Sequence, residues 1–245
     1  MSRAKIIGIS HCLIQLHEKE DNPDTFRLMG VGEFVAYVAR VSNPSNQHNN
    51  ETAPKLLRYL AKHKHWSPFE MVNVVMEINT TRDIARQILR HRSFAFQEFS
   101  QRYADPTQSL GFTTREARLQ DKKNRQNSIE IDDRTVLDPK TLRGSGWTKE
   151  EWVKKQQAVI DAANEAYDWA IGYNIAKEQA RAVLPEGLTN SRMYMNGTLR
   201  SWIHYCQLRM GPETQKEHRE VATDCWYEIT KKIPELKDAL DIGVQ

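Results

Sequence analysis

The sequence contains few cysteines and no recognisable pattern among them. The 245 residues include only Cys12, Cys206 and Cys225, with no C-x-x-C pair and no zinc-finger spacing. A sparse, odd number of cysteines does not form the disulfide framework of a small secreted domain. The cysteine content therefore predicts a protein of the reducing cytosol.

Long hydrophobic runs are also missing. The longest apolar stretches, such as Phe34 to Ala39, are much shorter than the ~18 residues that a membrane-spanning helix needs. The N-terminus has a few apolar residues after its basic pair and then turns polar, unlike a signal peptide. We therefore expect no membrane partner and no export, and a cytoplasmic location.

The chain also has no large excess of either positive or negative charge. The 35 Lys and Arg residues face 32 Asp and Glu residues, which gives a net charge of +3. So small an excess creates no general field for holding nucleic acid, and any anion site must be local. A non-enzymatic nucleotide- or RNA-binding protein remains an alternative, but it would predict a more basic chain.

The periodicity of apolar residues predicts an α+β fold in a single domain over residues 1–245. Val72, Val74, Met76 and Ile78 alternate with less apolar neighbours, as in a strand with one buried face. Helical spacing recurs more often, above all in the C-terminal half. We expect a mixed or antiparallel sheet packed by helices, with an extended segment at residues 5–17 and helices near residues 32–41, 52–63, 81–90, 148–172, 174–185, 198–211 and 221–233.

Particular polar residues are expected to begin these helices. Thr52, Thr80 or Thr81, Asn174 and Thr198 are candidate N-caps, and Thr148 with a Glu three residues later forms a capping box. Residues 113–146 are polar, rich in charge and without periodicity. This segment is a long loop or a hairpin insertion, and both a lid and a disordered linker are open interpretations.

The densest polar segment runs from residue 86 to residue 103. Arg86 and Arg90 are four residues apart on a helix, so their like charges favour a nearby carboxylate or phosphate. Beyond them an extended chain would place Glu98, Ser100 and Arg102 on one side, an arrangement suited to a sugar hydroxyl and a phosphate. The alternative is that the arginines are solvated and the neighbouring aromatic residues belong to the core.

Other candidate sites are weaker. His63 and His65 have a spacing that can bind a metal on a strand, but no cysteine or carboxylate completes a ligand set nearby, so no metal site is expected. His204 lies four residues after Arg200 and shares its helical face, away from the apolar stripe, which favours contact with a ligand. Ser100 has no adjacent base that would make it a nucleophile.

The segment Arg90-His91-Arg92, followed after seven residues by Ser100, resembles the Arg-His-Arg-x7-Ser signature of the flavin-dependent thymidylate synthases. The resemblance extends over most of residues 30–225. Its further segments, in order, are Ala39-Arg-Val-Ser42, His63-Lys-His-Trp-Ser-Pro-Phe-Glu70, Ala85-Arg-Gln87, Ala180-Arg-Ala-Val-Leu-Pro185 and Leu199-Arg-Ser-x-x-His-x-x-x-Leu-Arg209.

This resemblance implies a homotetramer with active sites shared between subunits, and it implies roles for particular residues. Catalytic roles fall to Arg90, Ser100 and Arg209. The implied FAD site comprises Ser42, His65, Ser67, Glu70, Arg90, His91, Arg92, Arg200 and His204. The implied deoxyuridylate site comprises Gln87, Glu98, Ser100, Gln101, Arg102, Arg181 and Arg209.

The same resemblance implies the conversion of dUMP to dTMP, with methylenetetrahydrofolate as one-carbon donor, FAD as redox cofactor and NADPH as reductant. A flavin-binding relative without synthase activity is the second alternative. The sequence departs from the common pattern at Thr198, often Asn, at Gln101, often Gly, and at Ala95 and Gln97, often Ser and Asn. Gln101 would matter if the backbone there needed a glycine.

The cysteines are not expected to act as nucleophiles. Cys206 has the helical spacing of Trp202 and Ile203, and Cys225 that of Val221, so both fall on buried faces. A reactive thiolate needs an exposed, electropositive setting instead.

Overall fold

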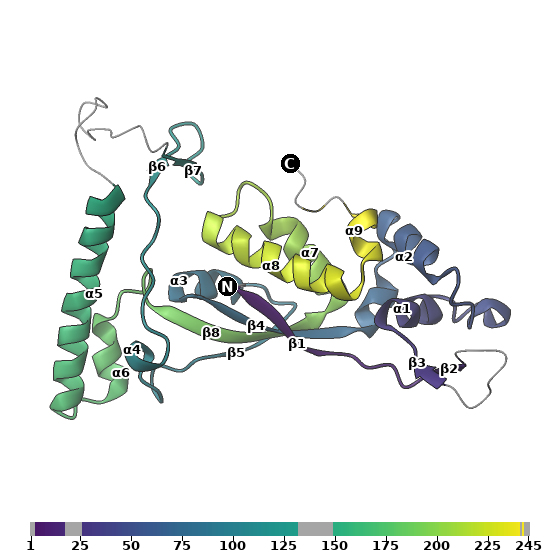
Figure 1. Cartoon of the computed structure of the whole chain (residues 1–245), viewed down its shortest axis with the longest axis horizontal. Coiled ribbons are helices and arrows are strands. Elements are labelled where there is room, and N and C mark those ends of the chain that lie inside the picture. Colours follow the sequence, from purple (N-terminus) through teal and green to yellow (C-terminus); the bar gives the residue numbers. More distant parts are fainter. Residues whose placement is uncertain (1–2, 18–25, 132–148, 241, 243–245) are drawn as a thin grey trace.

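A four-stranded antiparallel sheet forms the centre of the protein (Figure 1). The computed structural model describes residues 3–17, 26–131, 149–240 and 242. The strands follow the order β1-β4-β8-β5 and comprise Ala4–Ile9, Asn73–Thr81, Asn190–Thr198 and Ala95–Glu98, respectively. The α+β class is confirmed, and of the mixed or antiparallel sheet that the sequence predicts the structure has the antiparallel form.

Strand β4 shows why this sheet has one buried face. Val74, Met76 and Ile78 are at most 1% exposed, whereas the residues between them are partly exposed. Such alternation is what a pleated strand with one covered face requires. The strand predicted at residues 72–79 is confirmed, with small shifts at its ends.

Strand β8, the other central strand, is missing from the sequence prediction. It pairs with β4 along its whole length, from Asn73 opposite Thr198 to Thr81 opposite Asn190. Its residues Met193 and Met195 are buried and alternate with exposed neighbours, so a period of two is present. Few of its residues are β-branched, which explains why composition did not reveal it.

Helices cover the buried face of the sheet. α7 (Leu199–Arg209) and α8 (Lys216–Lys232) pack against it, as Figure 1 shows. Trp202 of α7 is fully buried, and its indole Nε1 donates to the backbone oxygen of Val74 at 3.0 Å. This bond satisfies the one polar group of the largest core side chain.

A tight contact between β8 and the segment after α3 (Arg82–Ile88) completes the core. A Cβ atom on Gly197 would lie 2.4 Å from the ring of Phe94. Phe94 in turn lies 4.9 Å from the ring of Trp202 and 6.0 Å from that of Tyr205. Position 197 is therefore a glycine because an aromatic ring occupies the space of its side chain.

The two ends of the elongated molecule are helical (Figure 1). One end carries α1, α2 and α9, which comprise Val31–Ala39, Ala53–Lys62 and Glu235–Ala239. The small β2–β3 hairpin (Gln15–His17 and Phe26–Leu28) lies there too. The other end carries α4 (Pro106–Ser109), α5 (Lys149–Gly172), α6 (Lys177–Ala180) and the short 3-10 turn η3 (Arg181–Val183). Further 3-10 turns are η1 (Pro44–Asn46) and η2 (Ser67–Met71).

The expected helix caps are only partly confirmed. Thr198 caps α7, because its Oγ1 accepts from the backbone N–H of Ser201 at 3.2 Å. Thr52 and Thr81 precede their helices without a capping bond from the side chain. The N-cap role of Asn174 is wrong: its φ of 58° places it in the left-handed turn that follows α5.

The helix expected at residues 174–185 is correspondingly short. It consists of α6 followed by η3, and Ala176 rather than Asn174 precedes it. The capping residue Thr148 lies outside the described residues.

Residues 113–131 include a short hairpin of β6 (Arg118–Gln120) and β7 (Ser128–Glu130). Ion pairs connect this hairpin and the segment before it to the start of α8. Arg118 pairs with Glu217, and Lys216 pairs with Glu116 and Glu130. The rest of the expected insertion, residues 132–146, lies outside the described residues.

Across the described part of the chain, no helix is both long enough and apolar enough to span a bilayer.

Candidate functional site

The end of α3 and the end of α7 meet at a histidine–arginine contact. Arg209, the last residue of α7, donates from Nε to Nε2 of His91 at 2.9 Å. The His91 ring lies edge-on to Tyr205 at 4.9 Å. The sequence-predicted residues His91 and Arg209 are thus brought together although 118 positions separate them.

Burial and neighbouring positive charges keep His91 neutral in this contact. Burial, with the positive charges of Arg209 and Arg90, lowers the pKa of His91 to about 4. A neutral imidazole can accept at one nitrogen, so Nε2 is free to receive the Arg209 N–H. The pair therefore carries one positive charge, on Arg209.

Behind His91 lies a buried histidine that the sequence prediction missed. His218 of α8 is fully buried, with Nδ1 3.2 Å from Oε1 of Gln87 and Nε2 3.1 Å from the Tyr205 hydroxyl. Burial, Arg209 and His91 lower its pKa to about 3. Its position three residues before Val221, on the apolar face of α8, was the available signal.

The arginines beside His91 differ in their partners. Arg90 and Arg92 are exposed, and within the described ranges neither side chain has an ion pair or hydrogen bond. Arg86 binds both carboxylate oxygens of Glu186, at 2.6–2.8 Å. The compensating anion expected for Arg86 is therefore a carboxylate of this chain.

The segment after β5 forms a second group of candidate residues. Glu98 Oε1 accepts from Ser191 at 2.7 Å and lies 3.3 Å from Arg82. The extended arrangement expected for Glu98, Ser100 and Arg102 is wrong beyond residue 100. The backbone N–H of Tyr103 donates to the Ser100 oxygen, so the chain turns there.

This turn brings Arg102 towards α6. Arg102 Nη2 lies 3.4 Å from Glu178 Oε2, and Arg181 Nε donates to the Glu178 backbone oxygen at 3.3 Å. The two predicted phosphate ligands therefore share Glu178. The side chains of the Arg102–Glu178 pair are both about half exposed, at 55% and 51%.

Gln101 precedes Arg102 in this turn. It is 4% exposed, and its Nε2 has no hydrogen-bond partner among the described residues. Its φ is not positive, so the backbone does not need the glycine that is common at this position. A buried amide donor without a partner is costly to the folded state.

A third group lies around η2 and the start of α7. Arg200 forms an ion pair with Glu70, and the exposed His204 lies edge-on to Trp66 at 5.1 Å. Burial and Arg200 lower the pKa of His204. The remaining predicted members of this group, Ser42, His65 and Ser67, are exposed in the turns after α1 and α2.

Thr198, which stands where Asn is common, is the residue just before the helix of this third group. Besides its capping contact, Thr198 donates from Oγ1 to Oγ of Ser201 at 3.1 Å. The hydroxyl is therefore already engaged within the helix end.

All three cysteines are buried, as the helical spacing predicted for Cys206 and Cys225. Burial raises the pKa of both thiols, so both stay protonated at neutral pH. In the described portion of the chain, no three His, Cys, Asp or Glu residues form a group that could hold a metal ion.

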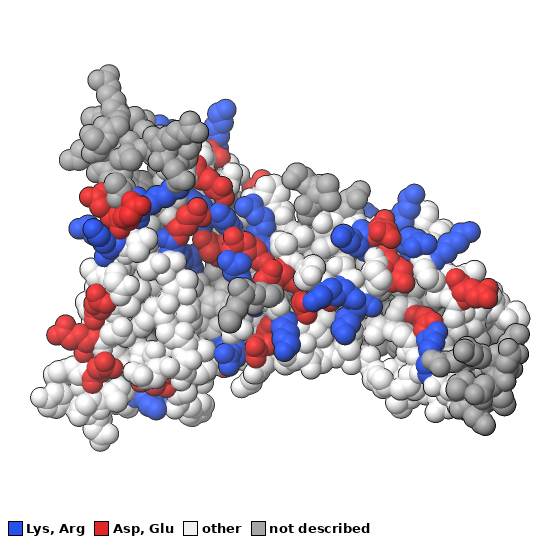
Figure 2. Space-filling view, in the orientation of Figure 1, with Lys and Arg blue, Asp and Glu red and all other residues white. Residues whose placement is uncertain are grey.

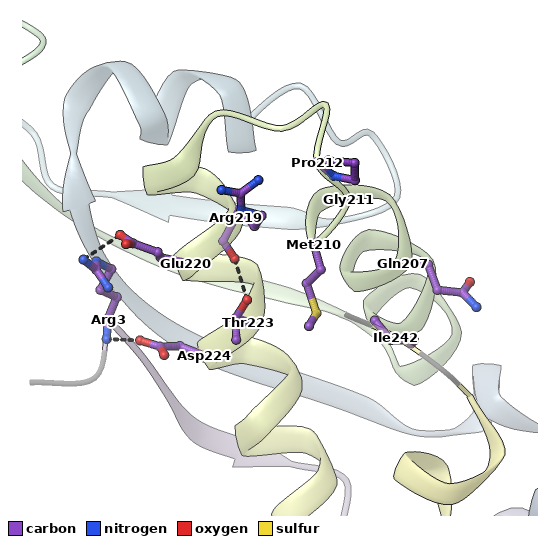
Figure 3. A pocket seen from close by; sticks show the side chains of 10 residues that line it. All are labelled: Arg3, Gln207, Met210, Gly211, Pro212, Arg219, Glu220, Thr223, Asp224 and Ile242. Carbon is purple, nitrogen blue, oxygen red and sulfur yellow. Dashed lines mark hydrogen bonds and ion pairs between the residues drawn. The ribbon is translucent and has the colours of Figure 1, made fainter. Parts of the chain in front are cut away.

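A pocket of about 590 Å³ lies beside the end of α7 and the middle of α8 (Figure 3). Arg3 lies at one edge of it, with its side chain 2.7 Å from Glu220 and its backbone N–H donating to Asp224 at 2.6 Å. None of the predicted site residues lines this pocket. Its charged groups therefore join β1 to α8 rather than extend the histidine–arginine contact.

Comparison with known proteins gives consistent relatives. The family model described as thymidylate synthase complementing protein matches residues 27–235. A probable flavin-dependent thymidylate synthase of Paramecium bursaria Chlorella virus 1 is 45% identical over 212 residues, which cover 85% of this chain and 90% of the relative. The flavin-dependent thymidylate synthase of Synechocystis sp. is 45% identical over 208 residues, covering 85% and 88%.

A solved structure has a similar fold. It is a UMP/dUMP methylase from Streptomyces cacaoi bound with 5-Br dUMP, with a TM-score of 0.66 and 22% identity over 96% of this chain and 93% of that one. The match of the family model over most of the chain, together with the 45% identity, shows that this chain belongs to the flavin-dependent thymidylate synthase family.

Proposed function

We propose that this protein is a flavin-dependent thymidylate synthase that converts dUMP to dTMP, with methylenetetrahydrofolate as one-carbon donor. The observation that carries the proposal is the contact between Arg209 and neutral His91, beside the exposed Arg90 and Arg92, which have no ion pair with any described residue. It places fixed positive charge where two sequence-predicted segments meet, the Arg90-His91-Arg92 motif and the helix that ends at Arg209. The catalytic roles of Arg90, Ser100 and Arg209 are part of this proposal.

The residues present fit FAD. Arg90 and Arg92 are exposed cations without a described partner, which suits the pyrophosphate of a dinucleotide. His204 and Trp66 offer ring surfaces next to Arg200, and His65 and Ser67 lie in the neighbouring turn. When bound, FAD would supply hydride chemistry, with NADPH as its reductant.

The nucleotide would be held by the turn after β5 and by α6. Arg102 and Arg181 already flank Glu178, so a phosphate could take the place of this weakly held carboxylate. Gln101 belongs to the same proposed site, and Glu98 keeps Oε2 for a sugar hydroxyl, since among the described residues its engaged oxygen is Oε1. Ser100 would bind substrate.

Arg209 would act on the pyrimidine. Its Nε is fixed by His91, which leaves the Nη atoms of the guanidinium for a uracil carbonyl oxygen. A positive charge held there stabilises negative charge that develops on the pyrimidine when its C5 becomes nucleophilic. Neutral His91 orients Arg209 without reducing that charge.

We also propose the homotetramer with shared sites. The third group, around η2, lies towards the α1–α2 end of the molecule, whereas Arg102 and Arg181 lie beside α6 at the other end (Figure 1). One chain does not gather all the predicted ligands around one point, which supports completion of each site by another subunit.

The surface of α5 supports the same assembly. Trp152, Val153, Val159, Trp169 and Tyr173 are each 42–71% exposed. Figure 2 shows uncharged surface between separate Asp and Glu patches over the α5 end, whereas charges of both signs crowd the middle of that face. Exposed aromatic and aliphatic side chains along one helix are typical of a subunit interface.

The remaining expectations belong to this proposal. A single catalytic domain over residues 1–245, a cytoplasmic location and the absence of nucleic-acid and membrane partners are consistent with an enzyme acting on a small nucleotide.

The proposal is tested with purified protein. We expect the visible spectrum of a bound flavin and formation of dTMP that depends on dUMP, methylenetetrahydrofolate and NADPH. A flavin spectrum without dTMP would indicate a relative that has lost synthase activity. A colourless monomer that does not take up FAD would contradict both the cofactor and the assembly.

A further inference from the structure

We propose that His218 and Gln215 are positioning residues that hold the side-chain amide of Gln87 in a single orientation towards the nucleotide. The inference rests on the proposed function, in which Gln87 binds dUMP. It concerns a chain of hydrogen bonds that runs from Glu217 to Tyr205.

The donor-to-acceptor direction of these hydrogen bonds is set at the carboxylate of Glu217. A carboxylate only accepts hydrogen bonds, so Gln215 must present its Nε2 to Glu217 Oε2, at 2.9 Å. Burial acts to raise the pKa of Glu217, but hydrogen bonds from its own backbone N–H, Arg118 and Gln215 outweigh burial and lower the pKa. Glu217 is therefore ionised and keeps its role as acceptor.

The next bond follows from the first. Because Gln215 uses its N–H₂ group for Glu217, its Oε1 faces Gln87 and accepts from Gln87 Nε2 at 2.8 Å. The amide of Gln87 is then turned with Oε1 towards His218, at 3.2 Å. A carbonyl oxygen requires a donor, so His218 carries its proton on Nδ1.

The last bond has the same direction. With the proton on Nδ1, His218 Nε2 accepts, and the Tyr205 hydroxyl 3.1 Å away donates. Burial raises the pKa of Tyr205, which keeps this hydroxyl protonated. Each group from Tyr205 to Glu217 therefore gives one hydrogen bond to the next, and reversing any single amide would set two donors or two acceptors against each other.

These hydrogen bonds leave Gln87 with one unused N–H on Nε2 and one unused lone pair on Oε1. Gln87 is only partly buried, whereas His218 is fully buried behind it. The nucleotide therefore meets an amide whose donor and acceptor sides are already determined. His218 and Gln215 would influence substrate affinity without touching the substrate, because a preorganised partner does not need to be ordered on binding.

Two variants of His218 distinguish this role from simple packing. In His218→Asn the side-chain N–H₂ can occupy the place of Nδ1 and still donate to Gln87. In His218→Gln the polar group reaches the place of Nε2, near Tyr205, and the donor to Gln87 is lost. Both variants remove the ring, so they serve as matched controls for each other.

The measurement is the dissociation constant for dUMP, by calorimetry on flavin-loaded protein, with KM and kcat measured alongside. We expect His218→Gln to bind dUMP about tenfold more weakly, with the larger change in KM, and His218→Asn to stay within about threefold of the unchanged protein. Equal affinities in both variants, or equal losses, would overturn the positioning role.

Glu217→Gln provides a second test on a less buried residue. An amide at position 217 can donate as well as accept, so the direction of the chain is no longer fixed. We expect weaker dUMP binding with the flavin spectrum retained, and an unchanged dissociation constant would overturn the inference even if the His218 variants do not fold. If the unchanged protein itself fails to bind dUMP, the proposed function is wrong and this inference falls with it.

Discussion

Two arginines assigned to the same nucleotide, Arg209 and Arg102, are held in very different ways. Arg209 donates to a neutral histidine surrounded by the rings of Tyr205 and Phe94. Arg102 extends from a turn and makes a 3.4 Å ion pair in which both side chains are about half exposed. The first arrangement is complete within one chain, whereas the second still has room for a ligand or another subunit.

The sharpest test of this difference is Arg209→Ala. We expect dUMP affinity to fall by about 1.5–3 kcal/mol, or roughly ten- to a hundredfold, because a charge-assisted contact is lost from an ordered site. Flavin content and melting temperature provide the controls, since Arg209 is not assigned to FAD. Unchanged dUMP affinity would remove Arg209 from the substrate site.

Arg102→Ala is expected to have a smaller effect. Exposed charge pairs contribute about 1 kcal/mol or less, so dUMP affinity should fall roughly fivefold at moderate salt. Because screening acts mainly on exposed charges, the deficit should shrink as salt is raised, while that of Arg209→Ala should persist. Equal salt dependence in the two variants would contradict the contrast between the regions.

Acid should lower the stability of the folded protein through two histidines near Arg209, His91 and His218. His91 and His218 have folded-state pKa values of about 4 and 3, against an ordinary 6.5. Below pH 6.5 the unfolded chain binds protons that these folded histidines do not, so stability falls as the pH drops from 6.5 to about 4, with no such dependence above 6.5. Melting temperatures measured from pH 4 to pH 8 should show this slope, and it should be shallower in His218→Asn.

The smallest effect is expected for Cys206→Ala. Its thiol lies fully buried beside Tyr205 and stays protonated, so its removal should cost only the stability of a small packing defect. The folded, flavin-loaded variant should form dTMP at close to the original rate. Complete loss of turnover would mean that a protein thiolate attacks the pyrimidine.

The sequence was most informative where one periodic pattern decided the structure. The alternation in β4 and the stripe of α7 are confirmed because burial on one face was the main constraint on those residues. The sequence also identified His91 and Arg209, through their place in a motif. That they touch could not be inferred, because it depends on how α3 and α7 pack.

The missed features depend on contacts between distant segments. Strand β8 lacks typical strand residues and is stabilised by its neighbours β4 and β5. The partner of Arg86 is Glu186, exactly one hundred positions later. His218 falls on the apolar face of α8, but its hydrogen-bond partners Gln87 and Tyr205 come from other helices and depend on how these pack.

The contact between Gly197 and Phe94 has a genetic consequence. A single methyl group at position 197 would displace the Phe94 ring, which also touches the aromatic residues around His91. Such a displacement weakens packing without removing any functional group. In a cell that depends on this protein for thymidylate, Gly197→Ala should therefore behave as a temperature-sensitive allele, with growth at low temperature and thymidine auxotrophy when warmed.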